Sequence, residues 1–247
     1  MPHSGSTALS LFLSSHSKIN SFGEVKSFIE QKKKTLEGTE NFCSCGERID
    51  QCPFWNKVKF HEGSSFLEKY NIFIENVFDS SPSDNLICDS SKDLFFLRKL
   101  NKDKIKVIFL VRDIRGWVAS MMLNLENKNK GKYCLFRFFF SWLKSNFSMI
   151  KYLNKNGIDY ICIYYKEFCF ESEKTSEKII NFLRLKKENL SIVNSNNHHI
   201  CYSNRMKLKK NNKIQYDTRW FDYFWVNFWY ILFFPLINVL NKYFKKN

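Results

Sequence analysis

Three short apolar runs, each ending in polar residues, constrain the fold of this chain more than any other feature. They are LICDSSKD (86–93), KVIFLVRD (106–113) and YICIYY (160–165). Continuous apolar runs bounded by charge are typical of buried parallel strands. Segments with helical spacing lie between them, as crossover connections require. The sequence therefore predicts an α/β fold in which a parallel sheet is flanked by helices.

The spacing of apolar residues also predicts where the helices lie. We expect them at 7–14, 24–34, 64–78, 116–126, 135–153 and 173–185. Because 247 residues with 44% hydrophobic side chains can bury a full core, we predict a single domain over 1–247. Two segments fall outside the alternating pattern: an insert rich in cysteine at about 38–62 and an aromatic, helical C-terminal segment at about 219–247.

Candidate binding residues follow from this pattern, because ligands of parallel α/β sheets bind beyond the carboxyl ends of the strands. Polar residues occupy these ends at 89–92, 112–113 and 164–166. The opening PHSGST (2–7) adds small residues ahead of a helix, where backbone N–H groups and hydroxyls bind oxyanions. It lacks the Gly-Lys-Ser/Thr of an ATP-binding loop, so ATP with magnesium is not expected. An ordinary helix cap is the alternative.

The opening loop and a second motif, VIFLVRDIRGWVAS (107–120), together resemble the sulfotransferase family that uses 3′-phosphoadenosine 5′-phosphosulfate. The resemblance implies a P-loop-containing, nucleotide hydrolase-like fold of the sulfotransferase type. It implies that the loop cradles the 5′-phosphosulfate through Ser4, Gly5, Ser6 and Thr7. It also implies that Arg112 and Ser120 hold the 3′-phosphate. Taken alone, Arg112 could instead pair with Asp113 or another acid at a strand end.

Later segments resemble the same family in order, so that the likeness spans about residues 2–224. DSSKDLFFLRKL (89–100) places Lys92 where the family has a lysine near the sulfate bridge. IYYKEFCFE (163–171) places Tyr165 at a strand end, although Lys166 replaces an acid and a later proline is absent. HHICYSNRMKL and DTRWFDYF resemble the segment that covers the nucleotide, which adds Ser203, Asn204 and Arg205 as cofactor-binding candidates.

The spacing of Glu24 suggests a catalytic role. Glu24 lies 21 residues after His3, and the tyrosylprotein branch of the family has its base glutamate at a similar spacing. A carboxylate takes the proton that an acceptor loses as it attacks sulfur, and cations stabilise the leaving oxygen. We therefore predict that Glu24, His3 and Lys92 are catalytic and that Glu24 lies near Lys92. A helix-N-terminal acid without a catalytic role is the alternative for Glu24.

Three cysteines of the insert, Cys43, Cys45 and Cys52, could ligate zinc with His61 beyond them. C-x-C-x(6)-C is not a strong zinc spacing, so free thiols or a disulfide are the preferred interpretation, and we assign no metal site. His198 and His199 are assigned to the segment that covers the nucleotide. The transfer reaction itself requires no metal.

The two ends of the chain also carry expectations. Family members have an apolar strand before the loop, and Met1 stands in its place, so we expect a sheet without its first strand. Residues 1–15 lack the pattern of a cleaved leader, so we expect a cytoplasmic protein with reduced thiols. The uncharged stretch 223–241 packs on the domain, contacts a membrane peripherally, or spans it.

The preferred hypothesis is a sulfotransferase that moves a sulfuryl group from the nucleotide donor to a hydroxyl or amine of a carbohydrate, lipid or peptide. The alternative is a catalytically impaired, N-terminally truncated member that binds nucleotide or a membrane surface. The net charge of +15 suggests an anionic partner, but no nucleic-acid-binding pattern accompanies it, so we predict no nucleic acid. The acceptor and the oligomeric state do not follow from the sequence.

Overall fold

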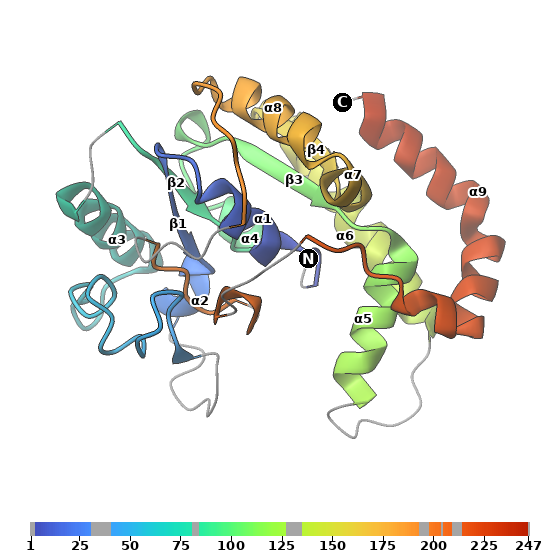
Figure 1. Cartoon of the computed structure of the whole chain (residues 1–247), viewed down its shortest axis with the longest axis horizontal. Helices are drawn as coiled ribbons and strands as arrows, with labels where there is room; N and C mark the ends of the chain where they lie inside the picture. Colours follow the sequence, from blue (N-terminus) through green and yellow to red (C-terminus); the bar gives the residue numbers. More distant parts are fainter. Residues whose placement is uncertain are drawn as a thin grey trace. The chain divides into compact units, whose positions relative to one another are not determined.

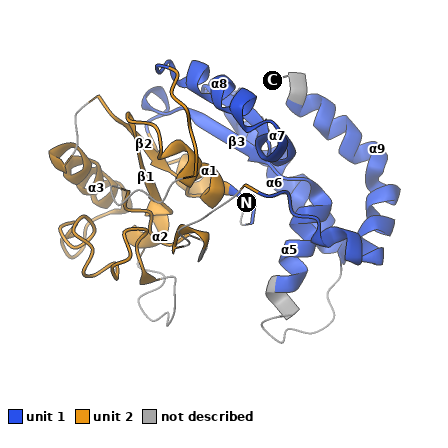
Figure 2. Ribbon diagram, viewed as in Figure 1, with its two compact units in different colours: residues 1–5, 101–186, 215–247 blue, residues 6–100, 187–214 orange. Residues whose placement is uncertain are grey.

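The computed structural model describes residues 3–30, 41–80, 84–126, 135–192, 198–203, 205–208 and 214–246. The chain divides into two compact units (Figure 2). Unit 1 comprises Met1–Gly5, Asn101–Lys186 and Gln215–Asn247, and unit 2 comprises Ser6–Leu100 and Lys187–Ile214. Each unit contains one pair of parallel strands and its own hydrophobic cluster.

Unit 2 is built on strands β1 (Ile19–Gly23) and β2 (Leu86–Asp89), which pair in parallel from Ile19 opposite Leu86 to Gly23 opposite Asp89 (Figure 1). Its helices are α1 (Ser6–Leu13), α2 (Val25–Ile29), α3 (Phe66–Ser80), α4 (Leu94–Leu97) and the 3-10 turn η3 (Arg205–Leu208). The carboxyl ends of β1 and β2 therefore lie side by side and bring the residues that follow them together.

The insert supplies much of the core of unit 2. Trp55 is 2% exposed and stacks on Phe73 of α3, with 5.6 Å between the ring centroids. Phe54 packs against Phe22 of β1 at 4.7 Å, and the Cys52 side chain is fully buried among these rings. Aromatic pairs of this kind add to the stabilisation from area burial alone. The insert is therefore an integral part of the core beside β1.

Unit 1 is built on strands β3 (Val107–Val111) and β4 (Tyr160–Tyr164), which pair in parallel from Val107 opposite Tyr160 to Val111 opposite Tyr164. Its helices are α5 (Ile114–Glu126), α6 (Leu135–Lys155), α7 (Tyr165–Phe170), α8 (Ser172–Leu183) and α9 (Phe224–Lys246), with 3-10 turns η2 (Lys102–Lys104) and η4 (Arg219–Asp222). Figure 1 shows this alternation of strand and helix along the chain.

Helix α9 packs on α5 and α6 through one of its faces only. Val226, Phe233 and Ile237 are buried in the cluster that these helices share. On the opposite side, large apolar side chains are exposed, including Trp225 at 60% and Ile231 at 72%. Phe224–Phe244 is long and apolar enough to cross a membrane by length and composition alone, and 17% of it is buried.

The predicted fold class is confirmed, since parallel strands alternate with helices in the predicted places. The sequence pattern does not predict strand β1. Its sequence, INSFG, contains asparagine, serine and glycine, although most of the strand is buried. The helix expected over 24–34 is shorter within the described residues, where α2 ends at Ile29. The expectation of a strand missing ahead of the loop concerns residues outside the described part of the chain.

Candidate functional site

Glu24 and Lys92 meet at the carboxyl ends of β1 and β2. The Lys92 ammonium donates a hydrogen bond to Oε1 of Glu24 over 2.6 Å, and the hydroxyl of Ser27 donates to Oε2 over 3.3 Å. The side chain of Lys92 is 18% exposed and that of Glu24 is 24% exposed, so the pair is shielded but accessible to solvent. The predicted proximity of Glu24 to Lys92 is therefore observed, across 68 residues of sequence.

Gly23 explains why Glu24 can occupy this position. Its φ is +78°, a region that side chains with a Cβ rarely adopt. A Cβ at Gly23 would lie 2.2 Å from the backbone oxygen of Cys201. The same Cys201 carbonyl accepts the N–H of Glu24 over 3.3 Å, which anchors the start of α2. Both the turn after β1 and the close passage of the later segment thus require glycine.

Asp89 joins the segments that carry Glu24 and Lys92. Its Oδ1 accepts the backbone N–H of Ser91 at 2.8 Å and that of Val25 at 3.4 Å, while the hydroxyl of Tyr70 donates to Oδ2 at 3.4 Å. Burial raises the pKa of Asp89 to about 6, although these hydrogen bonds oppose the shift. Asp89 is therefore a positioning group whose charge changes in the mildly acidic range.

A second ion pair fastens α2 to the segment after β2. Lys26 pairs with Asp93, and its backbone N–H donates to the Ser91 hydroxyl over 3.0 Å. Burial by itself would lower the pKa of Lys26, but Asp93 and Glu30 outweigh burial and raise it. Asp93 in turn caps α4 by accepting the N–H of Phe95 at 2.8 Å. Glu24 and Lys92 are thus held by neighbours on both sides.

The described part of the opening loop, from His3 to Gly5, belongs to unit 1 and packs against Tyr165. The φ of Gly5 is +92°, and a Cβ there would lie 2.5 Å from Cε2 of Tyr165. His3 also has a positive φ of 58°. The hydroxyl of Tyr165, the first residue of α7, donates to the carbonyl of Gln215 over 2.9 Å. Position 5 of the predicted phosphate loop therefore requires glycine, because it lies in close contact with Tyr165, a predicted nucleotide-binding residue.

Arg112 lies directly after β3 in unit 1. It is 8% exposed, and its guanidinium donates to the His3 carbonyl and pairs with Asp217. The guanidinium lies 5.3 Å from the centroid of the Tyr165 ring. Burial alone would raise the pKa of Asp217, but hydrogen bonds from Arg219 and the charge of Arg112 lower it. The acid that pairs with Arg112 is Asp217, while Asp113 pairs with Arg115.

Hydroxyl groups complete the set of predicted binding residues. Ser4 and Thr7 are each 7% exposed. The Oγ atoms of Ser6 and Ser203 are buried without a hydrogen-bond partner among the described residues, and such atoms suit an oxyanion that would accept from them. Ser120 is half-buried on α5. Asn204 lies outside the described residues, and of Arg205 only the backbone, in η3, is described.

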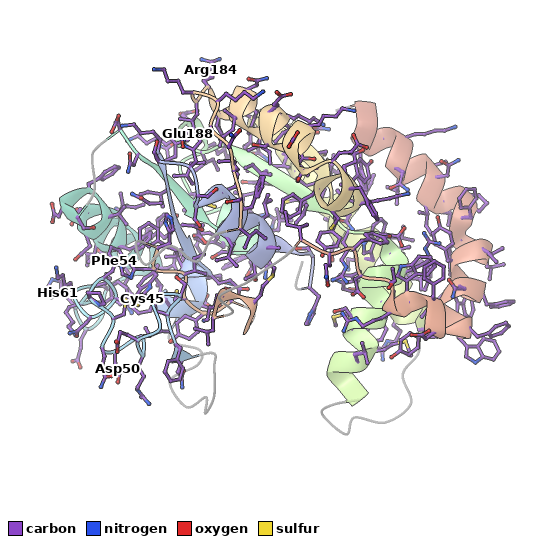
Figure 3. The ribbon with its side chains drawn as sticks, viewed as in Figure 1. Cys45, Asp50, Phe54, His61, Arg184 and Glu188 are labelled. Atoms are coloured by element: carbon purple, nitrogen blue, oxygen red, sulfur yellow. The ribbon has the colours of Figure 1, made fainter. Side chains whose placement is uncertain are left out.

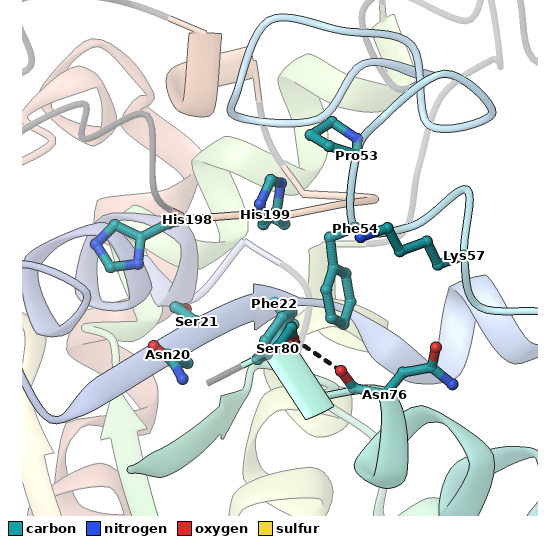
Figure 4. A pocket seen from close by; sticks show the side chains of 10 residues that line it. All are labelled: Asn20, Ser21, Phe22, Pro53, Phe54, Lys57, Asn76, Ser80, His198 and His199. Carbon is teal, nitrogen blue, oxygen red and sulfur yellow. Dashed lines mark hydrogen bonds between the residues drawn. The ribbon is translucent and has the colours of Figure 1, made fainter. Parts of the chain in front are cut away.

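A pocket of about 240 Å³ opens beside β1 in unit 2 (Figure 4). Asn20, Phe22, Phe54, Lys57 and His198 are among its lining residues. Burial lowers the pKa of His198 to about 4, with a smaller effect from neighbouring His199, so its imidazole is neutral at pH 7. Neither Glu24 nor Lys92 lines this pocket. It is therefore a largely polar recess of unit 2 that does not contain the Glu24–Lys92 pair.

Sequence reasoning counted Asp89 among the strand-end candidates without giving it a role, and it missed Asp217, although it did single out the segment that contains Asp217. Asp89 is the last residue of β2, a position that generally points to the site in parallel sheets. Asp217 begins the DTRW segment. Its place in the site is seen only from its contact with Arg112, which lies 105 residues earlier in the chain. Nothing in the local sequence around Asp217 indicates that partner.

Comparison with known proteins finds a matching protein family and similar solved structures. A family model described as the sulfotransferase family matches residues 1–189. The sulfotransferase domain from the curacin biosynthetic pathway is 19% identical, with a TM-score of 0.54 over 76% of this chain and 72% of that chain. A sulfotransferase from Alicyclobacillus acidocaldarius is 12% identical, with a TM-score of 0.46 over 76% of this chain and 80% of that one. No curated protein matches.

Proposed function

Because this chain belongs to the sulfotransferase family, we propose that it transfers a sulfuryl group from 3′-phosphoadenosine 5′-phosphosulfate to a hydroxyl or amine acceptor. The observation that carries the proposal is the Glu24–Lys92 pair at the ends of β1 and β2. A carboxylate beside an ammonium supplies both groups that the transfer needs: one accepts a proton and the other stabilises negative charge.

The roles of the two side chains follow from the balance of the reaction. The acceptor oxygen or nitrogen forms a bond to sulfur as the bond from sulfur to the donor's phosphate oxygen breaks. Glu24 takes the proton that the acceptor loses. Lys92 provides positive charge for the phosphate oxygen that leaves, and its hydrogen bond to Glu24 orients the carboxylate until the acceptor arrives. His3 is a further candidate donor to that oxygen when it is protonated.

Support for a nucleotide that carries several phosphates comes from each unit taken by itself. In unit 2, the buried hydroxyls of Ser6 and Ser203 have no hydrogen-bond partner within the described segments, and in unit 1, Arg112 offers a fixed guanidinium. The contacts of Arg112 with His3 and Asp217 use two of the five N–H donors of a guanidinium. The nucleotide would bring the sulfuryl group and leave as adenosine 3′,5′-bisphosphate. Ser4, Gly5, Thr7, Ser120 and Tyr165 complete the proposed binding set.

Calorimetric titration with adenosine 3′,5′-bisphosphate and with AMP tests the donor. We expect tighter binding of the bisphosphate, because the 3′-phosphate adds a charge-assisted contact. Transfer from a donor labelled in its sulfuryl group to carbohydrate, lipid and peptide acceptors then tests the reaction. Equal affinities would exclude this donor. A preference for the bisphosphate without transfer to any acceptor would favour the alternative of an impaired, nucleotide-binding member.

We further propose a peripheral membrane contact for α9. Its outer face exposes aromatic and aliphatic side chains, and no acidic residue occurs in Phe224–Lys246. Lys242 is exposed near the end of the helix, and the net charge of the chain is +15. Aromatic residues next to basic ones are typical of helices that lie at the surface of anionic bilayers. A cytoplasmic protein with this peripheral contact is the location we propose.

Flotation with vesicles tests this contact. The chain should float with vesicles that contain anionic lipid and float less with purely zwitterionic ones. Replacing Trp225 and Ile231 by serine should reduce flotation, whereas Phe78→Ser, which removes an exposed aromatic ring from α3, should not. A concentration-dependent dimer that forms through α9 without vesicle binding would show that a second copy covers this face instead.

A further inference from the structure

Three cysteines of the insert converge with a histidine from a distant segment, all within unit 2. The Sγ atoms of Cys43, Cys45 and Cys52 and a ring nitrogen of His199 all lie within 4.8 Å of one another. None of the three cysteines forms a disulfide. His61, the histidine that the sequence suggested, is exposed and lies apart from Cys45 (Figure 3). The fourth member is therefore His199, which the sequence pattern assigns to the segment that covers the nucleotide.

The distances within this group match the edges of a tetrahedral metal site. Sγ of Cys45 and Sγ of Cys52 are 3.8 Å apart, and Nδ1 of His199 lies 3.2 Å and 3.7 Å from the sulfurs of Cys52 and Cys43. Ligands at the usual zinc bond lengths would be separated by about 3.8 Å between two sulfurs and about 3.6 Å between sulfur and nitrogen. A disulfide would need sulfurs about 2.05 Å apart.

The backbone around the cysteines forms a tight hairpin that aims the thiols at one point. The N–H of Cys43 donates to the carbonyl of Glu47 over 2.8 Å, and the N–H of Gly46 donates to the carbonyl of Cys43 over 3.0 Å. Phe42 and Arg48 form an isolated antiparallel bridge that closes the hairpin. Gly46, with φ at +96°, makes the turn. Two of the thiols thus come from one short, fixed loop.

The insert also fixes the orientation of His199. The indole N–H of Trp55 donates to the His199 carbonyl over 2.7 Å, and the Phe54 ring stacks on the imidazole at 5.5 Å with an interplanar angle of 17°. Ser44 binds the residues on both sides of the histidine. Its hydroxyl donates to the His198 carbonyl over 2.5 Å and accepts the Ile200 N–H over 2.9 Å, and its own N–H donates to the Ile200 carbonyl over 3.1 Å. Such support around a ligand is expected of a metal site.

We propose that Cys43, Cys45, Cys52 and His199 bind a single structural zinc ion. Three thiolates and an imidazole suit zinc best among common divalent metals, and four protein ligands leave no open position for catalysis. On binding, the thiols lose their protons to solvent as the sulfur–zinc bonds form. Two of the cysteines, Cys43 and Cys52, are fully buried, as expected of ligands in a closed structural site.

The proposed ion would clamp the insert onto the segment that passes β1. Cys201, two residues after His199, donates its N–H to the Phe22 carbonyl over 3.0 Å and accepts the N–H of Glu24 over 3.3 Å. Zinc at His199 would therefore hold in place the chain that anchors Glu24. The role is structural, and it stands whether or not the transfer reaction proposed above is correct.

Metal analysis of the purified full chain tests the proposal. The wild-type protein should contain one zinc ion per chain, and its cobalt-substituted form should show the visible absorption and thiolate-to-metal charge-transfer bands of a tetrahedral sulfur site. His199→Ala and Cys45→Ser should weaken zinc binding by roughly tenfold or more. His61→Ala and Cys169→Ser, which change a histidine and a cysteine outside the group, should retain the metal.

Removing zinc from the wild-type chain with a chelator avoids any variant that fails to fold. Amide hydrogen exchange should then accelerate at Ile200 and Cys201, which are held against the insert and β1, and recover when zinc returns. Zinc content in the wild-type chain no higher than in Cys45→Ser would overturn the proposal. So would a Cys45–Cys52 disulfide in protein purified without reductant, or loss of metal in His61→Ala.

Discussion

The two parallel strand pairs of this protein carry similar groups at their carboxyl ends but surround them differently. In unit 2, Lys92 pairs with Glu24, and the two side chains are 18% and 24% exposed. In unit 1, Arg112 pairs with Asp217, and they are 8% and 11% exposed. A partly solvated pair exchanges partners and protons readily, whereas a buried one is costly to break. The first arrangement suits proton transfer and the second suits a fixed anchor.

The difference also appears in how each pair is held. Near the Glu24–Lys92 pair, Asp89 accepts the backbone N–H of Ser91, and the Cys201 carbonyl accepts the backbone N–H of Glu24. Arg112 is enclosed by the His3 carbonyl, the Tyr165 ring and the Asp217 carboxylate. Unit 2 therefore fixes the backbone and leaves the charged side chains room to move, while unit 1 fixes the charged group itself. Four substitutions test this contrast.

The largest effect is expected from Glu24→Gln, which keeps the shape of the side chain and removes its ability to accept a proton. Turnover should fall by roughly 10²–10⁴-fold, with little change in nucleotide affinity. Steady-state kinetics with a working acceptor measure this. Glu30→Gln, which alters another acid at the end of α2, should leave turnover close to wild type. Near wild-type turnover in Glu24→Gln would place the base elsewhere.

Arg112→Ala should remove most of the preference for adenosine 3′,5′-bisphosphate over AMP. A charge-assisted hydrogen bond contributes about 1.5–3 kcal/mol, so the preference should fall by roughly 10–100-fold. Calorimetric titration of both nucleotides gives the ratio. Arg219→Ala removes the more exposed of the two arginines that bind Asp217 and should change the ratio little. If both variants lose the preference equally, Asp217 and its neighbours, and not Arg112, determine it.

Asp89 provides a test of stability against pH. Since its pKa of about 6 in the folded protein exceeds the ordinary value of about 3.9, the folded state holds the proton more tightly than the unfolded state. The resulting stabilisation is complete below about pH 4 and is lost as the pH rises through 6. Between pH 5 and 8 the wild type should lose about 1 kcal/mol relative to Asp89→Asn.

Denaturant unfolding of both proteins at several pH values measures this difference. Asp79→Asn, which changes an exposed aspartate of α3, should follow the wild-type pH dependence. A constant difference between wild type and Asp89→Asn from pH 5 to 8 would mean that Asp89 does not titrate in this range and that its hydrogen bonds outweigh its burial.

The smallest effect is expected from Ser27→Ala. Its hydroxyl donates to Oε2 of Glu24 over 3.3 Å, a long contact beside the shorter one from Lys92. Loss of such a donor costs about 0.5–1 kcal/mol, or a factor of roughly 2–5 in turnover. Kinetics under the conditions used for Glu24→Gln measure it. A loss as large as that of Glu24→Gln would show that Ser27 is essential for orienting the carboxylate.

Much of the fold and part of the site could be predicted from the sequence. Strands β2, β3 and β4 and most of the helices follow from local apolar patterns, because each element must bury one face or both. The proximity of Glu24 to Lys92 was predicted from the family resemblance, which matched Lys92 to a family lysine and Glu24 to a base glutamate at a similar spacing from His3. Strand β1 could not be predicted, because its polar residues are buried by contacts with β2 and with Cys201 that no local pattern encodes.

By itself, the sequence determined the α/β class, the residues at the strand ends and the sulfotransferase family, since these depend on short-range periodicity and on motifs that are contiguous in the chain. Only the tertiary structure decided which partners these residues take. Asp217 reaches Arg112 across 105 residues, and His199 reaches Cys52 across 147. The physical reason is that ion pairs and ligand clusters form between side chains that are neighbours in space, and folding alone determines which distant segments become neighbours.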